Sequence, residues 1–178
     1  MIIKTSNIDE LNRIVRASLI QQSELDSNRI VNGVSIHGQE LLEKLNKYAY
    51  KSYDPDDAFI VFELQGRDSS SNVSQTTEDN TISYYMSYGI HVIVYGNGSP
   101  TLSNIICSRF RTAEVRDNLQ YQGIYIESIE NPRIGNDFVN SSLYMRCDFF
   151  INISCQMQIS QVKQDEIFDK IDITMENI

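Results

Sequence analysis

A long alternating stretch, from Leu143 to Ile159, constrains the fold of this chain more than any other feature of the sequence. Every odd position in it is apolar, and the even positions are mostly polar, with Tyr144 and Phe150 as exceptions. Side chains of a β-strand alternate between two faces, so the stretch predicts one half-buried strand. At about 3.3 Å per residue it would span about 55 Å, whereas most strands are about 17–20 Å long. The strand therefore either bends around the core or projects and pairs with another chain.

A second long alternation covers residues 82–94, where the even positions are all apolar or aromatic. We expect these even positions to share one core with the odd positions of residues 143–159. Gly89 predicts a bulge that bends this strand. His91 falls on the face away from the core and is interpreted as a surface residue, because no carboxylate or thiol pattern surrounds it. Shorter strands are predicted at residues 58–64, 122–130 and 168–175.

Helical spacing of apolar residues predicts three helices, at residues 8–21, 39–50 and 100–117. Asn7 is expected to cap the first helix, and Ser99 the third, with Pro100 at its first position. Residues 28–38 and 131–137 are interpreted as loops. This order of elements predicts an α+β fold, an antiparallel sheet with long strands flanked by helices.

The 178 residues suit one domain, with an N-terminal helical segment at residues 6–52. Residues 66–80 are polar and rich in Ser and Thr, with Val73 as their one apolar residue. Such a stretch cannot bury a core, so it is either a contact arm or a flexible loop.

The net charge is −9, and the isoelectric point is about 4.6. This charge argues against non-specific binding of nucleic acid, which requires clustered Lys and Arg. It suits either a surface that must not bind DNA or simple solubility. No apolar stretch has the length of a membrane span, and the N-terminus lacks the pattern of a signal peptide, so we expect the chain to stay in the cytoplasm where it is made.

No motif in the sequence predicts catalysis. The three cysteines, Cys107, Cys147 and Cys155, are interpreted as small buried hydrophobic residues. Neither a Cys–His spacing typical of zinc nor a Ser-His-Asp constellation is present. We therefore predict no catalytic residue, no metal and no cofactor, and we expect that the protein is not an enzyme.

Residues 58–160 resemble the tail-terminator and neck proteins of tailed bacteriophages. The resemblance rests on the strand YYMSYGIHVIVYGNG, the helix SPTLSNIICSRFRTAEVRDNL, the segment YQGIYIESIENPRIG and the Tyr144-Met145-Arg146 triplet. It implies a ring-forming structural protein between head and tail, or at the top of the tail, within the virion. Such rings are commonly hexamers, and a dodecamer also fits. The implied partners are further copies of the chain, the portal or adaptor and tail proteins, and DNA would only pass through the lumen.

A projecting end of the long strand would leave unpaired N–H and C=O groups that favour pairing with another chain. We expect that end near Leu143–Asp148 or near Gln156–Ser160. The alternative function is a soluble assembly or accessory protein that binds a single protein partner. The candidate residues of the subunit interface are Tyr144, Arg146, Gln156, Gln158, Arg67 and Asp68.

Overall fold

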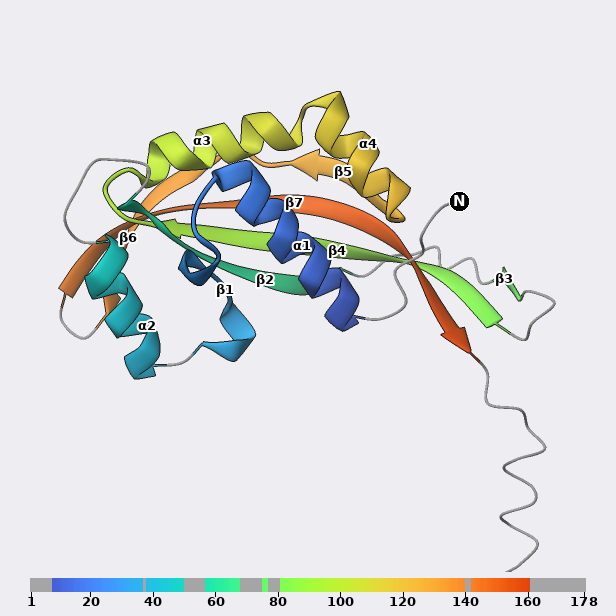
Figure 1. Cartoon of the computed structure of the whole chain (residues 1–178), viewed down its shortest axis with the longest axis horizontal. Coiled ribbons are helices and arrows are strands. Elements are labelled where there is room, and N and C mark those ends of the chain that lie inside the picture. The colour runs from blue at the N-terminus through green and yellow to red at the C-terminus, as the bar shows by residue number, and fades with distance from the viewer. Residues whose placement is uncertain are drawn as a thin grey trace, which may run out of the picture.

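A computed structural model describes residues 8–36, 38–49, 57–67, 75–76, 81–139 and 142–160. It has an α+β architecture, as predicted, in which helices pack on a long twisted sheet (Figure 1). Three predictions lie outside the described residues: the cap at Asn7, the strand at residues 168–175 and the interface role of Asp68. Most of the polar stretch at residues 66–80 also lies outside them.

Within the described residues the sheet contains seven strands in the order β1-β2-β4-β7-β5, with β3 pairing with β4 and β6 pairing with β7. All pairs are antiparallel except β1 with β2, which is parallel. The strands are β1 Ile30–Asn32, β2 Phe59–Arg67, β3 Gln75–Thr76, β4 Thr81–Tyr95, β5 Ile124–Ile129, β6 Arg133–Val139 and β7 Ser142–Ser160.

The two long strands pair in one continuous register, from Tyr95 opposite Arg146 to Thr81 opposite Ser160. Even positions of β4 and odd positions of β7 share the larger core, as the alternation predicts. The predicted bulge at Gly89 is wrong, because the register does not shift there. A Cβ at Gly89 would lie 3.4 Å from the ring of Phe150, about an ordinary van der Waals distance. The irregularity is instead in β5, between Ile126 and Ser128.

The helices cover the two faces of the sheet unequally. They are α1 Ile8–Ser23, α2 Gly38–Lys44 with a π-helical continuation Leu45–Ala49, α3 Ser99–Phe110 and α4 Ala113–Tyr121. Figure 1 shows α1, α3 and α4 over one face, which we call the covered face, and α2 lies on the other, which we call the polar face. The larger core fills the covered face, and a smaller cluster around Leu45, Phe59 and Tyr144 lies under α2 and its continuation.

One helix expected from the sequence is two helices in the structure. Residues 100–117 were expected to form a single helix, but α3 ends at Phe110 and α4 begins at Ala113. Thr112 is extended, with φ −68° and ψ 149°, and its hydroxyl donates to the carbonyl of Arg109. This side-chain bond competes with the helical backbone and breaks the helix there. Ser99 is the first buried residue of α3 and not its cap, a position that Gly98 takes.

Two predicted loops contain strands. Residues 28–38 hold β1, whose Ile30 is fully buried in the larger core. Residues 131–137 fall mostly in β6, which forms an antiparallel hairpin with the first part of β7. Neither stretch has a long alternation of its own, and each strand forms on a longer neighbour that offers its backbone.

Candidate subunit interface

The surplus length of β7 is handled differently at its two ends. Near its start, β6 pairs with residues 142–148 to form what we call the hairpin, residues 133–139 and 142–148. Near its end, residues 155–160 pair with residues 81–86 of β4 to form what we call the ribbon. Figure 1 shows the ribbon running on past α1 and α4. The start of β7 therefore pairs with β6 within the chain, whereas its end projects beyond the helices together with β4 (Figure 1).

A charged cluster on the polar face surrounds Arg146 in the hairpin. The Nη1 atom of Arg146 lies 3.1 Å from Oδ2 of Asp137, and its Nε lies 3.6 Å from Oδ1 of Asp148. The Tyr95 hydroxyl donates to the same Asp137 oxygen at 3.1 Å. Burial opposes the positive charge of Arg146, but Asp148 and Asp137 outweigh it and raise the pKa of the guanidinium. Arg146 therefore stays charged and ties three strands together.

The same cluster changes the ionisation of Tyr95. Burial of the ring, followed by the negative charge of Asp137 and the hydrogen bond to it, raises the pKa of Tyr95 to about 12. Arg146 acts in the opposite direction. The phenol therefore remains a hydrogen-bond donor throughout the neutral range.

His91 extends this cluster along the sheet. Its ring stacks on Phe150, with centroids 4.5 Å apart and planes inclined by 6°. Its Nε2 lies 3.6 Å from Oδ2 of Asp148. His91 therefore lies on the face away from the larger core, as predicted, but the expectation that no carboxylate lies near it is wrong. The sequence holds the missed signal: in the register His91 faces Phe150, and Asp148 is the next residue on the same face of β7.

The predicted interface residues fall into two groups. Tyr144 and Arg146 lie in the hairpin, where Tyr144 is 2% exposed and its hydroxyl donates to the side-chain oxygen of Asn46. Gln156 lies in the ribbon, where it faces Tyr85, and Arg67 lies close to the ribbon, where it faces Ser87, both on the polar face. Arg146 and Gln156 are ten residues apart, about 33 Å along one strand. The structure therefore does not bring all the candidates into one patch.

The ribbon leaves one backbone edge open among the described residues. Three bonds fix the direction of the β7 backbone: Gly96 N–H donates to Met145 O, Glu130 N–H to Phe150 O, and Gln156 N–H to Gly123 O. Odd residues of β7 therefore point toward β4, and even residues toward β5 and β6. Since β5 pairs only as far as Cys155, Gln158 and Ser160 direct their backbone groups to an edge that no described strand covers.

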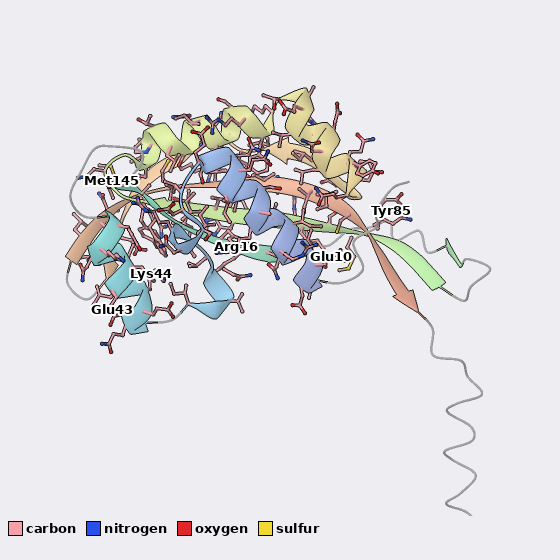
Figure 2. The ribbon with its side chains drawn as sticks, viewed as in Figure 1. Glu10, Arg16, Glu43, Lys44, Tyr85 and Met145 are labelled. Atoms are coloured by element: carbon pink, nitrogen blue, oxygen red, sulfur yellow. The ribbon has the colours of Figure 1, made fainter. Side chains whose placement is uncertain are left out.

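The hairpin exposes apolar side chains that sequence reasoning missed. Ile134, Phe138 and Leu143 are 67%, 74% and 51% exposed. They share the covered face of the sheet with Cys147, because Ile134 faces Cys147 and Phe138 faces Leu143. The interpretation of residues 131–137 as a loop hid this patch. Figure 2 marks Met145, which lies on the same face of this hairpin.

Neither a metal centre nor a membrane span is found in the part of the chain that the structure describes. The described His, Cys, Asp and Glu side chains form no group of three that could hold a metal ion. The described helices are too short or too polar to cross a bilayer. All three cysteines are free and buried, as predicted.

A comparison with models of known protein families identifies the family of this chain. The model of the phage neck terminator protein family matches residues 18–178. The chain therefore belongs to the phage neck terminator family, and is a structural component of the virion. A search of curated protein sequences found no match.

Proposed function

We propose that the chain is the subunit of a closed ring at the neck or at the top of the tail. The ring joins the portal or adaptor on one side to tail proteins on the other. A hexamer is the expected form, and a dodecamer is the second. The net charge of −9 supports a lumen that lets DNA pass without binding it.

The open edge of the ribbon is the observation that carries this proposal. Unpaired N–H and C=O groups on an edge strand are a template for pairing with another chain. If the edge at Gln158 and Ser160 pairs with a different part of the next copy, the contact is heterologous, whereas pairing with the same edge would give only a two-fold dimer. Heterologous contacts repeated around an axis close into rings. Gln156, in the ribbon on the polar face, is the side chain that we place in this contact, whereas Arg67 lies on β2, on the other side of β4 from the open edge.

The mass of the protein in solution and in the particle tests the ring. Native mass spectrometry of the purified chain should show a species of six or twelve subunits, and purified virions should contain the chain in the same number. A chain that stays monomeric at every concentration and is absent from virions would overturn the proposal. That outcome would favour the alternative, a soluble accessory protein with one protein partner.

Two proline substitutions test whether the ribbon edge is in the contact. Gln158→Pro removes a donor from the open edge, and Met157→Pro removes one that points to β4. A lost backbone hydrogen bond of about 1.4 kcal/mol would raise the concentration for half-assembly about tenfold in Gln158→Pro. The melting temperature of that variant should stay near the wild-type value, whereas Met157→Pro should lower it. Wild-type assembly by Gln158→Pro would show that the open edge plays no part.

A further inference from the structure

β6 pairs with the backbone of β7 on one side, and its outer edge is open among the described residues. Even residues of β7 direct their backbone groups toward β6, and in the register they face odd residues, as Asp148 faces Arg133. The backbone groups of the even residues of β6 therefore point away from β7, toward an edge that no described strand covers. These residues are Ile134, Asn136 and Phe138.

Exposed apolar side chains lie on the same strand, on the covered face. Ile134 and Phe138 are 67% and 74% exposed, and Leu143, which faces Phe138, is 51% exposed. We call these three side chains the hairpin patch. Open backbone groups beside an apolar face are a template for one more strand. Because the side chains of a strand alternate, such a strand would be apolar at every second residue.

The residues that follow β7 in the sequence have this pattern. Residues 161–178 lie outside the described residues, but their sequence is apolar at Ile171, Ile173 and Met175 and polar at each position beside these three. This apolar set spans five residues, as the even residues of β6 do. The match to the phage neck terminator family extends to residue 178, so the segment belongs to the region that the family model describes.

The segment begins too far from the hairpin to pair with it inside one subunit. Figure 1 shows the hairpin and the end of the ribbon at opposite ends of the molecule. From Cys147, which faces Ile134, β7 runs 13 residues to Ser160, about 43 Å along the strand. Ile171 is 11 residues beyond Ser160, and a fully extended chain of that length spans at most about 40 Å. A return within one chain would leave no residue for the reversal of direction.

We propose that residues 171–175 of one copy pair as a strand with the outer edge of β6 in the next copy, with Ile173 opposite Asn136. This inference rests on the proposed ring and specifies one of its subunit contacts. The added strand satisfies the open backbone groups of β6 and covers the hairpin patch with its apolar side chains. Because the donated segment and β6 are different surfaces, the contact is heterologous and can be repeated around a ring.

A pair of neighbouring substitutions tests the donated segment. Ile173→Asp should raise the concentration for half-assembly at least about tenfold, because it places an unpaired charge against the hairpin patch. Thr174→Asp is the matched control, since neighbouring residues of a strand point to opposite faces. Melting temperatures of both variants show whether the monomer stays folded. Equal assembly by the two folded variants would overturn the contact.

The acceptor is tested in the same way on the hairpin. Phe138→Asp should also raise the concentration for half-assembly at least about tenfold. Its melting temperature should stay near the wild-type value, because the side chain is exposed in the monomer. Tyr121→Asp, at an exposed aromatic residue on α4, is the control and should assemble as wild type does. Wild-type assembly by Phe138→Asp would show that the patch plays no part.

A cross-link between the two surfaces covers the case in which a charged variant does not fold. Ile173 and Asn136 are the middle residues of the two sets, so they face each other whichever direction the added strand takes. A full-length chain with both Asn136→Cys and Ile173→Cys, oxidised with diamide, should give a ladder of disulfide-linked oligomers. Asn136→Cys combined with Thr174→Cys should give none. The native cysteines are buried and stay out of the reaction.

The products separate a failure of this contact from a failure of the ring. If wild type forms rings but the disulfide is absent or joins residues of one chain, the exchange is wrong and the ring stands. If the disulfide joins different copies and the oligomers stop at two, the exchange stands and the ring is wrong. A ladder that ends at six or twelve copies supports both.

Discussion

The two ends of β7 differ in what they leave unsatisfied. At the hairpin end, β6 pairs with the backbone of the strand, and Arg146 and Tyr95 both bind Asp137 within the chain. The same end exposes an apolar patch. At the ribbon end the situation is reversed, because the backbone edge beyond Cys155 is open on the β5 side among the described residues.

This difference shows that a strand longer than its core creates two separate problems. One is the unpaired backbone at its edge, and the other is the apolar face that no helix covers. A hairpin within the chain solves only the first. The hairpin end is therefore suited to an apolar contact, and the ribbon end to backbone pairing with another chain.

The largest effect is expected midway between the two ends. Ile151 is fully buried and faces Ile90 and Ile129 across both neighbouring strands. Ile151→Asp places an unpaired charge in the larger core and should lower the free energy of unfolding by about 3–5 kcal/mol. Denaturant titration followed by circular dichroism measures the loss. Ser154→Asp, on the polar face of the same strand, is the control and should cost about 1 kcal/mol or less.

Unfolding of the Ile151→Asp variant should also disorder the hairpin and the ribbon together, since both depend on this core. A variant with wild-type stability would show that the register of β4 and β7 is wrong.

The centre of the sheet was predictable from sequence, and its edges were not. The alternation of residues 82–94 and 143–159 fixes which side chains face the core, because a strand has a period of two. β1 and β6 carry no such signal of their own, and they form strands because β2 and β7 offer a long backbone edge. The break at Thr112 depends on one hydroxyl bond to Arg109, which a helical apolar pattern does not reveal.

The unusual features of the two ends of β7 were predictable in their location but not in their side chains. Surplus strand length correctly indicated the two ends of β7 as the unusual places. The side chains chosen there were polar, because polar residues were assumed to face a partner. Tyr144 and Arg146 instead bind groups of their own chain, and the exposed groups of the hairpin are apolar. Whether a polar side chain has a partner depends on residues distant in sequence, such as Asn46 and Asp137.

The pH dependence of stability tests the polar cluster around Asp137 at the hairpin end. The folded pKa of Tyr95 is about 12, and the unfolded value is about 10, so the folded state holds the phenol proton more tightly. The resulting stabilisation is fully present below pH 10 and is lost as the pH rises from 10 to 12. The expected loss is about 1–3 kcal/mol.

Tyr95→Phe should flatten this part of the stability profile relative to wild type, measured by urea unfolding between pH 9 and pH 12 (about one point per half unit). Tyr121→Phe, at an exposed tyrosine, should leave the profile unchanged. Equal slopes in Tyr95→Phe and wild type would contradict the hydrogen-bonded cluster around Asp137.

The smallest expected effect is a difference in how easily the two ends of β7 open. Cys147 and Cys155 both face the covered side, one at each end of β7, and both are fully buried. Burial raises the pKa of Cys155 to about 12 and also raises the pKa of Cys147. Because the thiolate is the reactive form, each cysteine should react with an alkylating reagent at pH 8 only after local opening.

Cys155 should be labelled about tenfold faster than Cys147, a difference of about 1.4 kcal/mol in opening. It faces the first residue of β5, Ile124, and lies five residues from the end of β7, so fraying of the ribbon reaches it directly. Cys147 lies between β4 and β6, opposite Val94 and Ile134. Single-cysteine chains, made by replacing the other two cysteines with Ala, allow both rates to be measured by mass spectrometry. Assembly should slow the labelling of Cys155, because a neighbouring copy paired with the ribbon edge would hold the ribbon closed. Faster labelling of Cys147 than of Cys155 in the monomer would show that the hairpin end opens more easily than the ribbon end.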